Sequence, residues 1–247
     1  MNFLALATDY DGTLARDGVA PQSTVAALEK LRASGRKVLL VTGRLLEDML
    51  EVFPSYSLFE WIVAENGALL YSPASGEMRL LAESVPAGFA EALRGRRIPE
   101  VSVGRAIVAT WRPHEREVLQ TLAEMKISRQ IIYNKHAVMV LPEGVDKASG
   151  LMAALKVIKI PARNVVAVGD AENDLPMLEQ CGCGVAVSNA LDSVKTKADV
   201  VTTADHGAGV EELINHLLDD DLASLASPGG WHKKLLRSRS DDRWADS

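Results

Sequence analysis

Three short apolar segments, far apart in the chain, each end in acidic or hydroxyl side chains. Residues 3–8, 38–41 and 165–168 have the length and the continuous apolar character of strands that are covered on both faces. Parallel strands of this kind end along one edge of a sheet, where open α/β proteins place their functional sites. The sequence therefore predicts an α/β fold whose site collects residues from distant parts of the chain.

The first segment ends in two aspartates, Asp9 and Asp11, which are followed by Gly12 and Thr13. In an extended chain these carboxylates point to the same side, so they repel each other unless a cation neutralises them or one is protonated. One carboxylate could attack as a nucleophile, while the other donates a proton to a leaving group and later takes one from water. The alternative is that Asp-Tyr-Asp-Gly forms only a polar turn.

The other two segments end in groups suited to phosphate and metal. The second is followed by Thr42, Gly43 and Arg44, and a hydroxyl with exposed backbone amides suits phosphoryl oxygens. The third is followed by an acidic stretch, residues 169–174, and Lys147 opens a predicted helix between the two. Each stretch alone could be a solvated turn, but three polar strand ends with a lysine between them favour a shared site.

These motifs, in this order, resemble those of haloacid dehalogenase superfamily phosphatases. The first motif is residues 9–14 (DYDGTL), the second is residues 42–44 (TGR), the third is Lys147 and the fourth is residues 169–174 (GDAEND). The resemblance extends over residues 3–218 and is to subfamily IIB, the Cof-type and sucrose-phosphatase-like branch. It implies a Rossmann-like parallel sheet core flanked by helices, with a small α+β cap domain inserted between the second and third motifs.

The resemblance also implies a role for each motif residue. Asp9 would attack phosphorus and form an aspartyl-phosphate, while Asp11 would protonate the leaving oxygen and then activate water. Thr42 and Lys147 would complete the catalytic set by binding a phosphoryl oxygen and by neutralising charge. The phosphate- and substrate-binding residues would be Thr42, Gly43, Arg44, Lys147 and Asn173.

The cofactor that the resemblance implies is Mg²⁺. Its site would be made by Asp9, Asp11 through its main-chain carbonyl, Asp170 and Asp174, with Asn173 in support. Mg²⁺ is a hard cation that prefers oxygen ligands, and phosphoryl transfer needs mainly positioning and charge neutralisation. Asp174 has an alternative role, which is to cap a helix over residues 175–179.

Composition limits the classes of partner. A net charge of −6 argues against nucleic acid, and no apolar stretch approaches the length of about 18 residues that a membrane span needs. Cys181 and Cys183 are too close for an ordinary disulfide and too few for a zinc site, so we expect them to be structural. The N-terminus has no secretory pattern, which together with the scarcity of cysteine favours the cytoplasm. We expect a monomer or a homodimer.

The chain divides into a core, a cap and a tail. The core would comprise residues 1–81 and 142–219, and the cap residues 82–141, where the pattern changes to helix, strand, helix and two strands. Residues 220–247 have the composition of a flexible tail. The alternative for the tail is that Trp231 and the Leu235-Leu236 pair dock on the core.

Because the core would contact only the phosphoryl group, the cap should choose the substrate. Five basic cap residues could face the cleft, namely Arg105, Arg112, His114, Lys135 and His136. Such a set would suit phosphoglycolate, a sugar phosphate or a phosphorylated sugar acid. Plain surface exposure is the alternative for each, and His206 at a predicted helix entry is interpreted as structural.

Two other functions use the same residues. A phosphomannomutase-like phosphotransferase would pass the phosphoryl group from the aspartate to a sugar hydroxyl, although such enzymes usually have a larger cap. A sugar-phosphate-binding module without activity is disfavoured, because every expected acid, the threonine and the lysine are present. The preferred interpretation is a Mg²⁺-dependent phosphomonoester hydrolase acting on a small phosphorylated metabolite.

Overall fold

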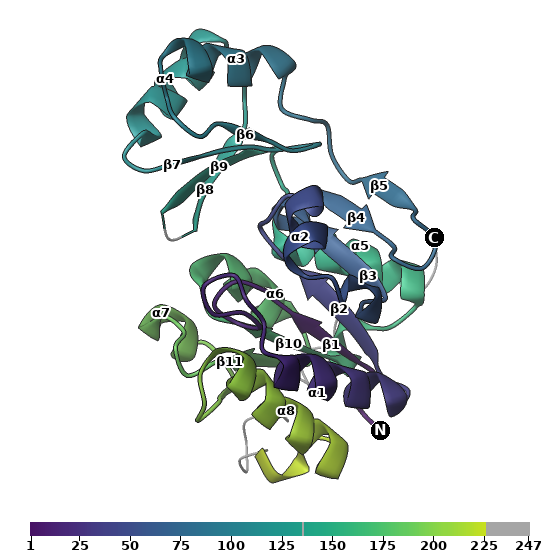
Figure 1. The fold of residues 1–247 in the computed structure, drawn as a ribbon. Coiled ribbons are helices and arrows are strands. Elements are labelled where there is room, and N and C mark those ends of the chain that lie inside the picture. The colour runs from purple at the N-terminus through teal and green to yellow at the C-terminus, as the bar shows by residue number, and fades with distance from the viewer. Residues whose placement is uncertain (135, 226–247) are drawn as a thin grey trace, which may run out of the picture.

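The computed structural model describes residues 1–134 and 136–225, with the side chain of Asn134 left out. The larger of its two sheets has eight strands in the order β12-β11-β10-β1-β2-β3-β4-β5 (Figure 1). The strands are β1 (Ala5–Thr8), β2 (Lys37–Val41), β3 (Trp61–Ala64), β4 (Leu69–Tyr71), β5 (Met78–Leu80), β10 (Val165–Gly169), β11 (Cys183–Ala186) and β12 (Val200–Val201).

The centre of this sheet is parallel, as the continuous apolar runs predict. All four residues of β1 are buried, and the strand pairs in parallel with β10 on one side and β2 on the other. A strand that is buried on both faces needs apolar side chains on both, which explains the absence of alternation. Strands β4 and β5 extend the edge in antiparallel pairing and were not predicted from the sequence.

Helices cover both faces of the sheet. Helix α1 packs against α8, and α5 packs against α6 on the other side (Figure 1). The helices are α1 (Gln22–Ala33), α2 (Leu46–Val52), α5 (Lys147–Ile158), α6 (Leu175–Gln180), α7 (Asp192–Lys195) and α8 (His206–Asp220). Short 3-10 turns are η1 (Tyr56–Leu58), η2 (Glu65–Gly67), η3 (Ala162–Asn164), η4 (Glu172–Asp174) and η5 (Ala223–Leu225).

The smaller sheet has four strands in the order β6-β7-β9-β8 and carries two helices. Its elements are α3 (Ala87–Gly95), β6 (Ser102–Val103), β7 (Val108–Trp111), α4 (Glu115–Glu124), β8 (Gln130–Asn134) and β9 (Ala137–Leu141). We propose that the core and the cap follow these two sheets. Figure 1 shows the cap as a separate layer, with its sheet turned toward the core and its helices away from it.

Alternation along β9 gives the cap sheet two different faces. Val138 and Val140 pack into the same apolar cluster as Phe89 of α3 and Val118 of α4. Their neighbour Met139 belongs to a second cluster on the opposite face. Because side chains of a strand alternate in direction, one face supports the cap helices and the other faces the core.

The ordered chain extends past the predicted start of the tail at residue 220. Helix α8 includes Asp220, the carboxylate of Asp221 accepts a hydrogen bond from Arg36 at 3.0 Å, and Leu222 is buried. Residues 220–225 therefore belong to the core surface. The predicted tail residues from 226 onward, including Trp231 and the Leu235-Leu236 pair, lie outside the described residues.

Candidate active site

The polar strand ends meet at one edge of the larger sheet. Asp9 follows β1, Thr42 follows β2 and Asp170 follows β10. The register pairs Thr8 with Leu40 and with Val168, so these strand ends are level with one another. Lys147 is the first residue of α5, whose start is fixed by a reciprocal pair of hydrogen bonds between Asp146 and Ser149. The fold therefore brings the predicted motifs together.

Lys147 makes two short ion pairs in the floor of this site. Its Nζ donates to Asp9 Oδ1 at 2.6 Å and to Asp174 Oδ1 at 2.6 Å. The lysine side chain is 1% exposed and the two carboxylates are 6% and 0% exposed. Burial raises the pKa of Asp9, and Lys147 opposes this rise. Burial alone would lower the pKa of Lys147, but Asp174 and Asp9 outweigh it, so the pKa is raised and the ammonium stays charged.

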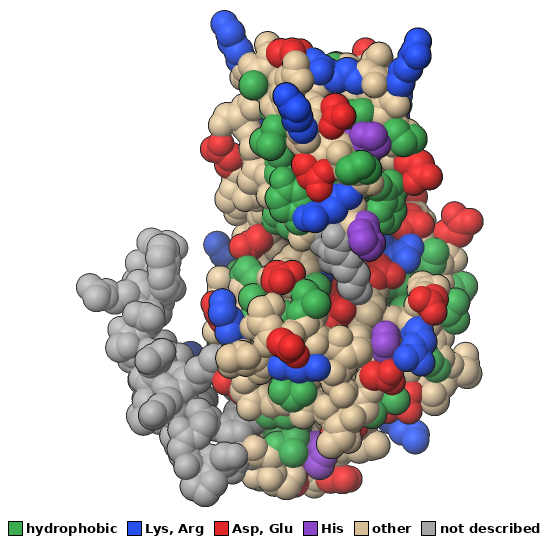
Figure 2. Space-filling view, turned by 90° about the vertical axis from the view of Figure 1, so that its left-hand side faces the viewer, with side chains coloured by type: hydrophobic (Ala, Val, Ile, Leu, Met, Phe, Trp, Pro, Cys, Tyr) green, Lys and Arg blue, Asp and Glu red, His purple; other side chains and the backbone are tan. Residues whose placement is uncertain are grey.

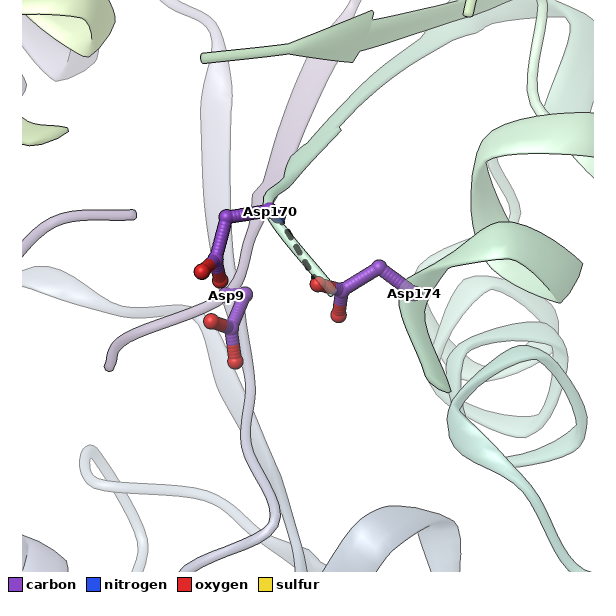
Figure 3. Close-up of side chains that lie close together, drawn as sticks. All are labelled: Asp9, Asp170 and Asp174. Carbon is purple, nitrogen blue, oxygen red and sulfur yellow. Dashed lines mark hydrogen bonds between the residues drawn. The ribbon is translucent and has the colours of Figure 1, made fainter. Parts of the chain in front are cut away.

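Three carboxylates could hold a cation here. Asp9, Asp170 and Asp174 each offer one oxygen, and these oxygens all lie within 4.8 Å of one another (Figure 3). Lys147 supplies one positive charge to this cluster of three acids, so negative charge remains in excess. An all-oxygen site with excess negative charge fits a hard divalent cation. The cluster contains three of the four predicted metal-binding residues; the fourth, Asp11, which was expected to bind through its main-chain carbonyl, is not among these carboxylates.

Asp174 positions the acidic loop as well as pairing with Lys147. Its Oδ2 accepts hydrogen bonds from the backbone N–H groups of Asp170 and Ala171, both at 3.0 Å. Its side chain makes no capping hydrogen bond to α6, so the alternative role as a helix cap is wrong. The close approach depends on Gly169, since a Cβ at that position would lie 2.5 Å from Asp174 Cβ.

Asp11 lies beside the cleft, paired with Arg44. Arg44 Nε and Nη2 contact the two Asp11 oxygens at 2.6 and 2.8 Å, and Nη1 contacts Asp48 Oδ2 at 2.7 Å. The guanidinium also lies 5.5 Å from the centre of the Tyr10 ring. Hydrogen bonding to Asp11 raises the pKa of Arg44. Asp48 and Tyr10 were not predicted as site residues, since Asp48 lies outside the four motifs and Tyr10, although inside the first motif, was given no role there.

Thr42 and Asn173, two of the predicted phosphate-binding residues, each make a hydrogen bond within the core. The Thr42 hydroxyl oxygen accepts a hydrogen bond from the backbone N–H of Arg44 at 3.1 Å. Asn173 Nδ2 donates to Asn66 Oδ1 at 3.0 Å. Among the described residues, Asn66 Nδ2 and Asn173 Oδ1 are buried with no hydrogen-bond partner. Asn66 was not predicted as a site residue, and the structure adds it through this contact with Asn173.

A cleft of about 690 Å³ lies between the core and the cap, and Asp9 is part of its lining. Its core side includes Asp9, Asp11, Gly43, Arg44 and His206. His206 opens α8 as expected, but it also lines the cleft, which the sequence did not indicate. The cap side is made by Ser102, Ile107, Ala109, Trp111, Ala137 and Met139.

Of the predicted basic cap residues, the four that the structure describes are not part of the cleft lining. Arg105 pairs with Glu47 at 2.7 Å, and Arg112 pairs with Glu115 at 3.1 Å. His114 and His136 are also absent from the cleft lining, and Lys135 lies outside the described residues. In the part of the chain that the structure describes, the cap therefore presents to the cleft five apolar residues, one of them a tryptophan, and one serine, rather than a cationic surface.

Comparison with known proteins agrees with this geometry. The model of the haloacid dehalogenase-like hydrolase family matches residues 6–87 and 105–214. The chain belongs to this family. Its gap at residues 88–104 falls in the cap, and every predicted motif lies inside the matched ranges.

Related proteins from archaea cover nearly the whole chain. A phosphoglycolate phosphatase of Methanopyrus kandleri is 31% identical over 224 residues, covering 86% of this chain and 96% of its own. One from Methanothermobacter thermautotrophicus is 29% identical over 227 residues, with coverages of 87% and 98%. The 31% identity over nearly the full length of the relative agrees with membership of this family.

Solved structures share the fold. A haloacid dehalogenase-like hydrolase from Bacteroides thetaiotaomicron superposes with a TM-score of 0.72 at 20% identity, covering 87% of this chain and 99% of its own. A sugar phosphatase of haloacid dehalogenase (HAD) subclass IIB superposes with a TM-score of 0.67 at 22% identity, covering 86% of this chain and 98% of its own. This likeness confirms the predicted core and inserted-cap class of fold.

Two further predictions concern the cysteines and membrane-spanning helices. Cys181 and Cys183 are both buried and form no disulfide with each other. Within residues 1–134 and 136–225, no helix combines the length and the apolar character needed to cross a membrane.

Proposed function

We propose that this chain is a Mg²⁺-dependent phosphomonoester hydrolase in which Asp9 is the nucleophile. The observation that carries the proposal is the contact of Lys147 with both Asp9 and Asp174, beside Asp170 and at the base of a cleft. Asp9, Asp170 and the main-chain carbonyl of Asp11 would hold Mg²⁺, with Asp174 orienting the loop. The bound ion would supply charge neutralisation at the transferring phosphoryl group.

The first half-reaction forms a bond between an Asp9 oxygen and phosphorus and breaks the bond from phosphorus to the leaving oxygen. Asp11 gives its proton to that oxygen, and Lys147 with the Thr42 hydroxyl offsets charge on the phosphoryl group. For Asp11 to reach the leaving oxygen, its contact with Arg44 has to open. Arg44 is then available to bind the substrate.

The second half-reaction returns the enzyme to its starting state. The Asp11 carboxylate takes a proton from water, and the water oxygen attacks phosphorus while the bond from phosphorus to Asp9 breaks. Inorganic phosphate leaves, with Asp9 restored as a carboxylate. Since the same carboxyl group acts first as acid and then as base, one residue serves both steps.

Phosphoglycolate is the substrate we propose first. Relatives at 28 to 31% identity, including the two named above, are phosphoglycolate phosphatases. In addition, Arg44 could bind a substrate carboxylate once Asp11 releases it. A sugar phosphate is the second candidate, because Trp111 and the apolar cap side suit the face of a sugar ring. Both are phosphomonoesters of small hydroxylated compounds.

A screen of phosphorylated metabolites for Mg²⁺-dependent phosphate release tests the proposal. Release of phosphate without a sugar acceptor supports a hydrolase, whereas transfer that needs an acceptor supports the phosphotransferase. No release from any phosphomonoester, with Mg²⁺ present, would refute the proposal. A strong preference for phosphoglycolate over hexose phosphates would identify the first candidate.

We also propose that the protein acts in a reducing compartment such as the cytoplasm and does not bind nucleic acid. The scarcity of cysteine, two residues in the chain, supports the first point. The net charge of −6 supports the second, as do the acidic and basic side chains that are interspersed over cap and core on the face in Figure 2. Its partner would be the small phosphorylated substrate alone, bound by a monomer or a homodimer.

A further inference from the structure

The turn η2 has an unusual backbone. Glu65, Asn66 and Gly67 have φ angles of +52°, +54° and +106°. Left-handed geometry is uncommon for residues other than glycine and persists only where the surroundings hold it. Here the backbone N–H groups of Glu65 and Asn66 donate to the carbonyls of Arg44 and Thr42, both at 2.9 Å. The turn is therefore fixed to the second motif.

The side chain of Glu65 reaches out of this turn into the cap. It is fully buried, and its Oε1 accepts the backbone N–H of Arg105 at 2.9 Å. Its Oε2 accepts those of Ala106 at 2.8 Å and Ile107 at 3.2 Å. Gly104 allows this approach, since a Cβ there would lie 2.6 Å from the Glu65 carboxyl carbon. One buried carboxylate thus accepts hydrogen bonds from the backbone N–H groups of three consecutive cap residues.

The same turn contacts the third and fourth motifs. Asn66 Oδ1 accepts from Asn173 at 3.0 Å. A Cβ at Gly67 would lie 1.9 Å from the Asp146 carbonyl oxygen and 3.3 Å from the Lys147 backbone nitrogen, so η2 packs directly against the start of α5. The residue that binds the cap is therefore adjacent to the residues that support the catalytic floor.

We propose that Glu65 is a positioning residue that fixes the cap strand β7 over the cleft. Ile107, the last of the three amide donors, directly precedes β7, and Ile107, Ala109 and Trp111 line the cleft. Charge-assisted hydrogen bonds to a buried carboxylate hold a segment more firmly than an exposed ion pair. The inference rests on the proposed function in that this cleft receives the leaving group of a phosphomonoester.

The experiment compares two substrates in the presence of Mg²⁺. The ring of 4-nitrophenyl phosphate is large enough to reach the cap side, whereas acetyl phosphate has a small leaving group that depends on the core. Glu65→Ala, which removes all three hydrogen bonds, should lower kcat/KM for the aryl substrate at least about tenfold more than for acetyl phosphate, chiefly through KM. Glu65→Gln keeps an acceptor for some of the amides and should give an intermediate loss.

Gly104→Ala tests the same contact from the cap side and leaves the η2 turn itself unaltered. Its added methyl group would push the cap away from Glu65, so the same substrate-selective loss is expected. Glu47→Gln is the matched control. Glu47 also joins core to cap, through Arg105 at 2.7 Å, but its side chain is 60% exposed. This variant should keep both activities unchanged.

Hydrogen exchange gives a readout that does not depend on activity. In the wild type the amides of Ala106 and Ile107 should be protected, and in Glu65→Ala their exchange should accelerate while the centre of β1 stays protected. Equal losses on both substrates, unchanged kinetics in the Glu65 and Gly104 variants, or unchanged protection would each overturn the inference. A wild type that releases no phosphate from either substrate would instead refute the proposed function, and the exchange measurement would then decide the role of Glu65.

Discussion

The ammonium of Lys147 lies 2.6 Å from an oxygen of Asp9 and 2.6 Å from an oxygen of Asp174. All three side chains are buried, and Asp170 adds another buried carboxylate to the cluster. Buried charges of one sign destabilise a fold unless they are compensated, and one lysine cannot balance three acids. The nucleophile, the candidate metal site and the stability of the core are therefore linked through a single side chain.

Lys147→Met should destabilise the protein strongly. Methionine fills a similar volume but leaves the buried carboxylates without their cation, which costs about 3–5 kcal/mol of the free energy of unfolding. Urea unfolding without divalent metal measures this loss. Lys37→Met is the control, because the Lys37 side chain is 46% exposed and its pair with Glu60 contributes only about 0–1 kcal/mol. Equal stabilities for the two variants would contradict the prediction.

Asp9→Asn should abolish turnover while the fold is retained. Asparagine has nearly the same shape but no carboxylate to attack phosphorus, and its neutral amide relieves repulsion from Asp170 and Asp174. Phosphate release measures the first effect, and thermal unfolding without metal measures the second. Asp192→Asn, at a side chain that is fully exposed on α7, should behave as the wild type. Residual turnover at the wild-type rate would refute Asp9 as nucleophile.

Mg²⁺ should stabilise the folded protein through the acidic cluster. A ligand present at about 100 times its dissociation constant stabilises by about 2.7 kcal/mol, so Tm should rise on titration with MgCl₂ and fall again with a chelator. Asp170→Asn should lose most of this shift, because it removes one of three clustered carboxylates. If this variant gained the same Tm shift as the wild type, the ion would have to bind elsewhere.

Glu212 should make stability depend on pH. It accepts hydrogen bonds from the backbone N–H groups of Thr203 and Ala204. Burial raises the pKa of Glu212, but the hydrogen bonds from Thr203 and Ala204 outweigh it, so the pKa lies below its ordinary value of 4.5. A carboxyl whose pKa is lowered by folding stabilises the protein above its unfolded pKa and loses that contribution as pH falls through the folded pKa.

Urea unfolding of Glu212→Gln checks this sign. The variant should be less stable than the wild type near neutral pH, and the difference should shrink as the pH falls below about 4.5. Glu179→Gln is a suitable control, since Glu179 contacts Lys197 only at 3.8 Å and is 54% exposed. A difference that grew on acidification would show that the carboxylate does not stabilise the fold.

The sequence predicts the polar residues at the sheet edge because each of them directly follows an apolar run that can be recognised as a strand. An apolar run that stops at an acid or a hydroxyl marks both the strand and the position of the side chain, so the pattern points to Asp9, Thr42 and the acidic stretch 169–174, while the resemblance to the family selects Asp170 within that stretch. The ion pair of Lys147 with Asp174 was not predicted from the sequence. These residues depend on topology, which the alternation of strands and helices specifies.

The cap side of the cleft was not predictable in the same way. Its lining comes from alternate positions of β7 and β9, such as Ala109, Trp111 and Met139, which are apolar and look like core residues in a sequence. The sequence analysis selected charged cap residues instead, but Arg105 and Arg112 form ion pairs and are not part of the cleft lining. Strand β5 was missed because it has only three residues, Met78–Leu80, which is too short a run to indicate a strand from sequence.

Asp11→Asn should slow the reaction most for substrates with poor leaving groups. An alkoxide leaving from a sugar phosphate or from phosphoglycolate needs a proton as the bond to phosphorus breaks, whereas a nitrophenolate does not. The ratio of kcat/KM between wild type and variant should therefore be larger for alkyl phosphates by about tenfold or more. Asp48→Asn is the control, because Asp48 shares Arg44 with Asp11 but would transfer no proton. An equal loss on alkyl and aryl substrates would mean that Asp11 acts only through its pairing with Arg44.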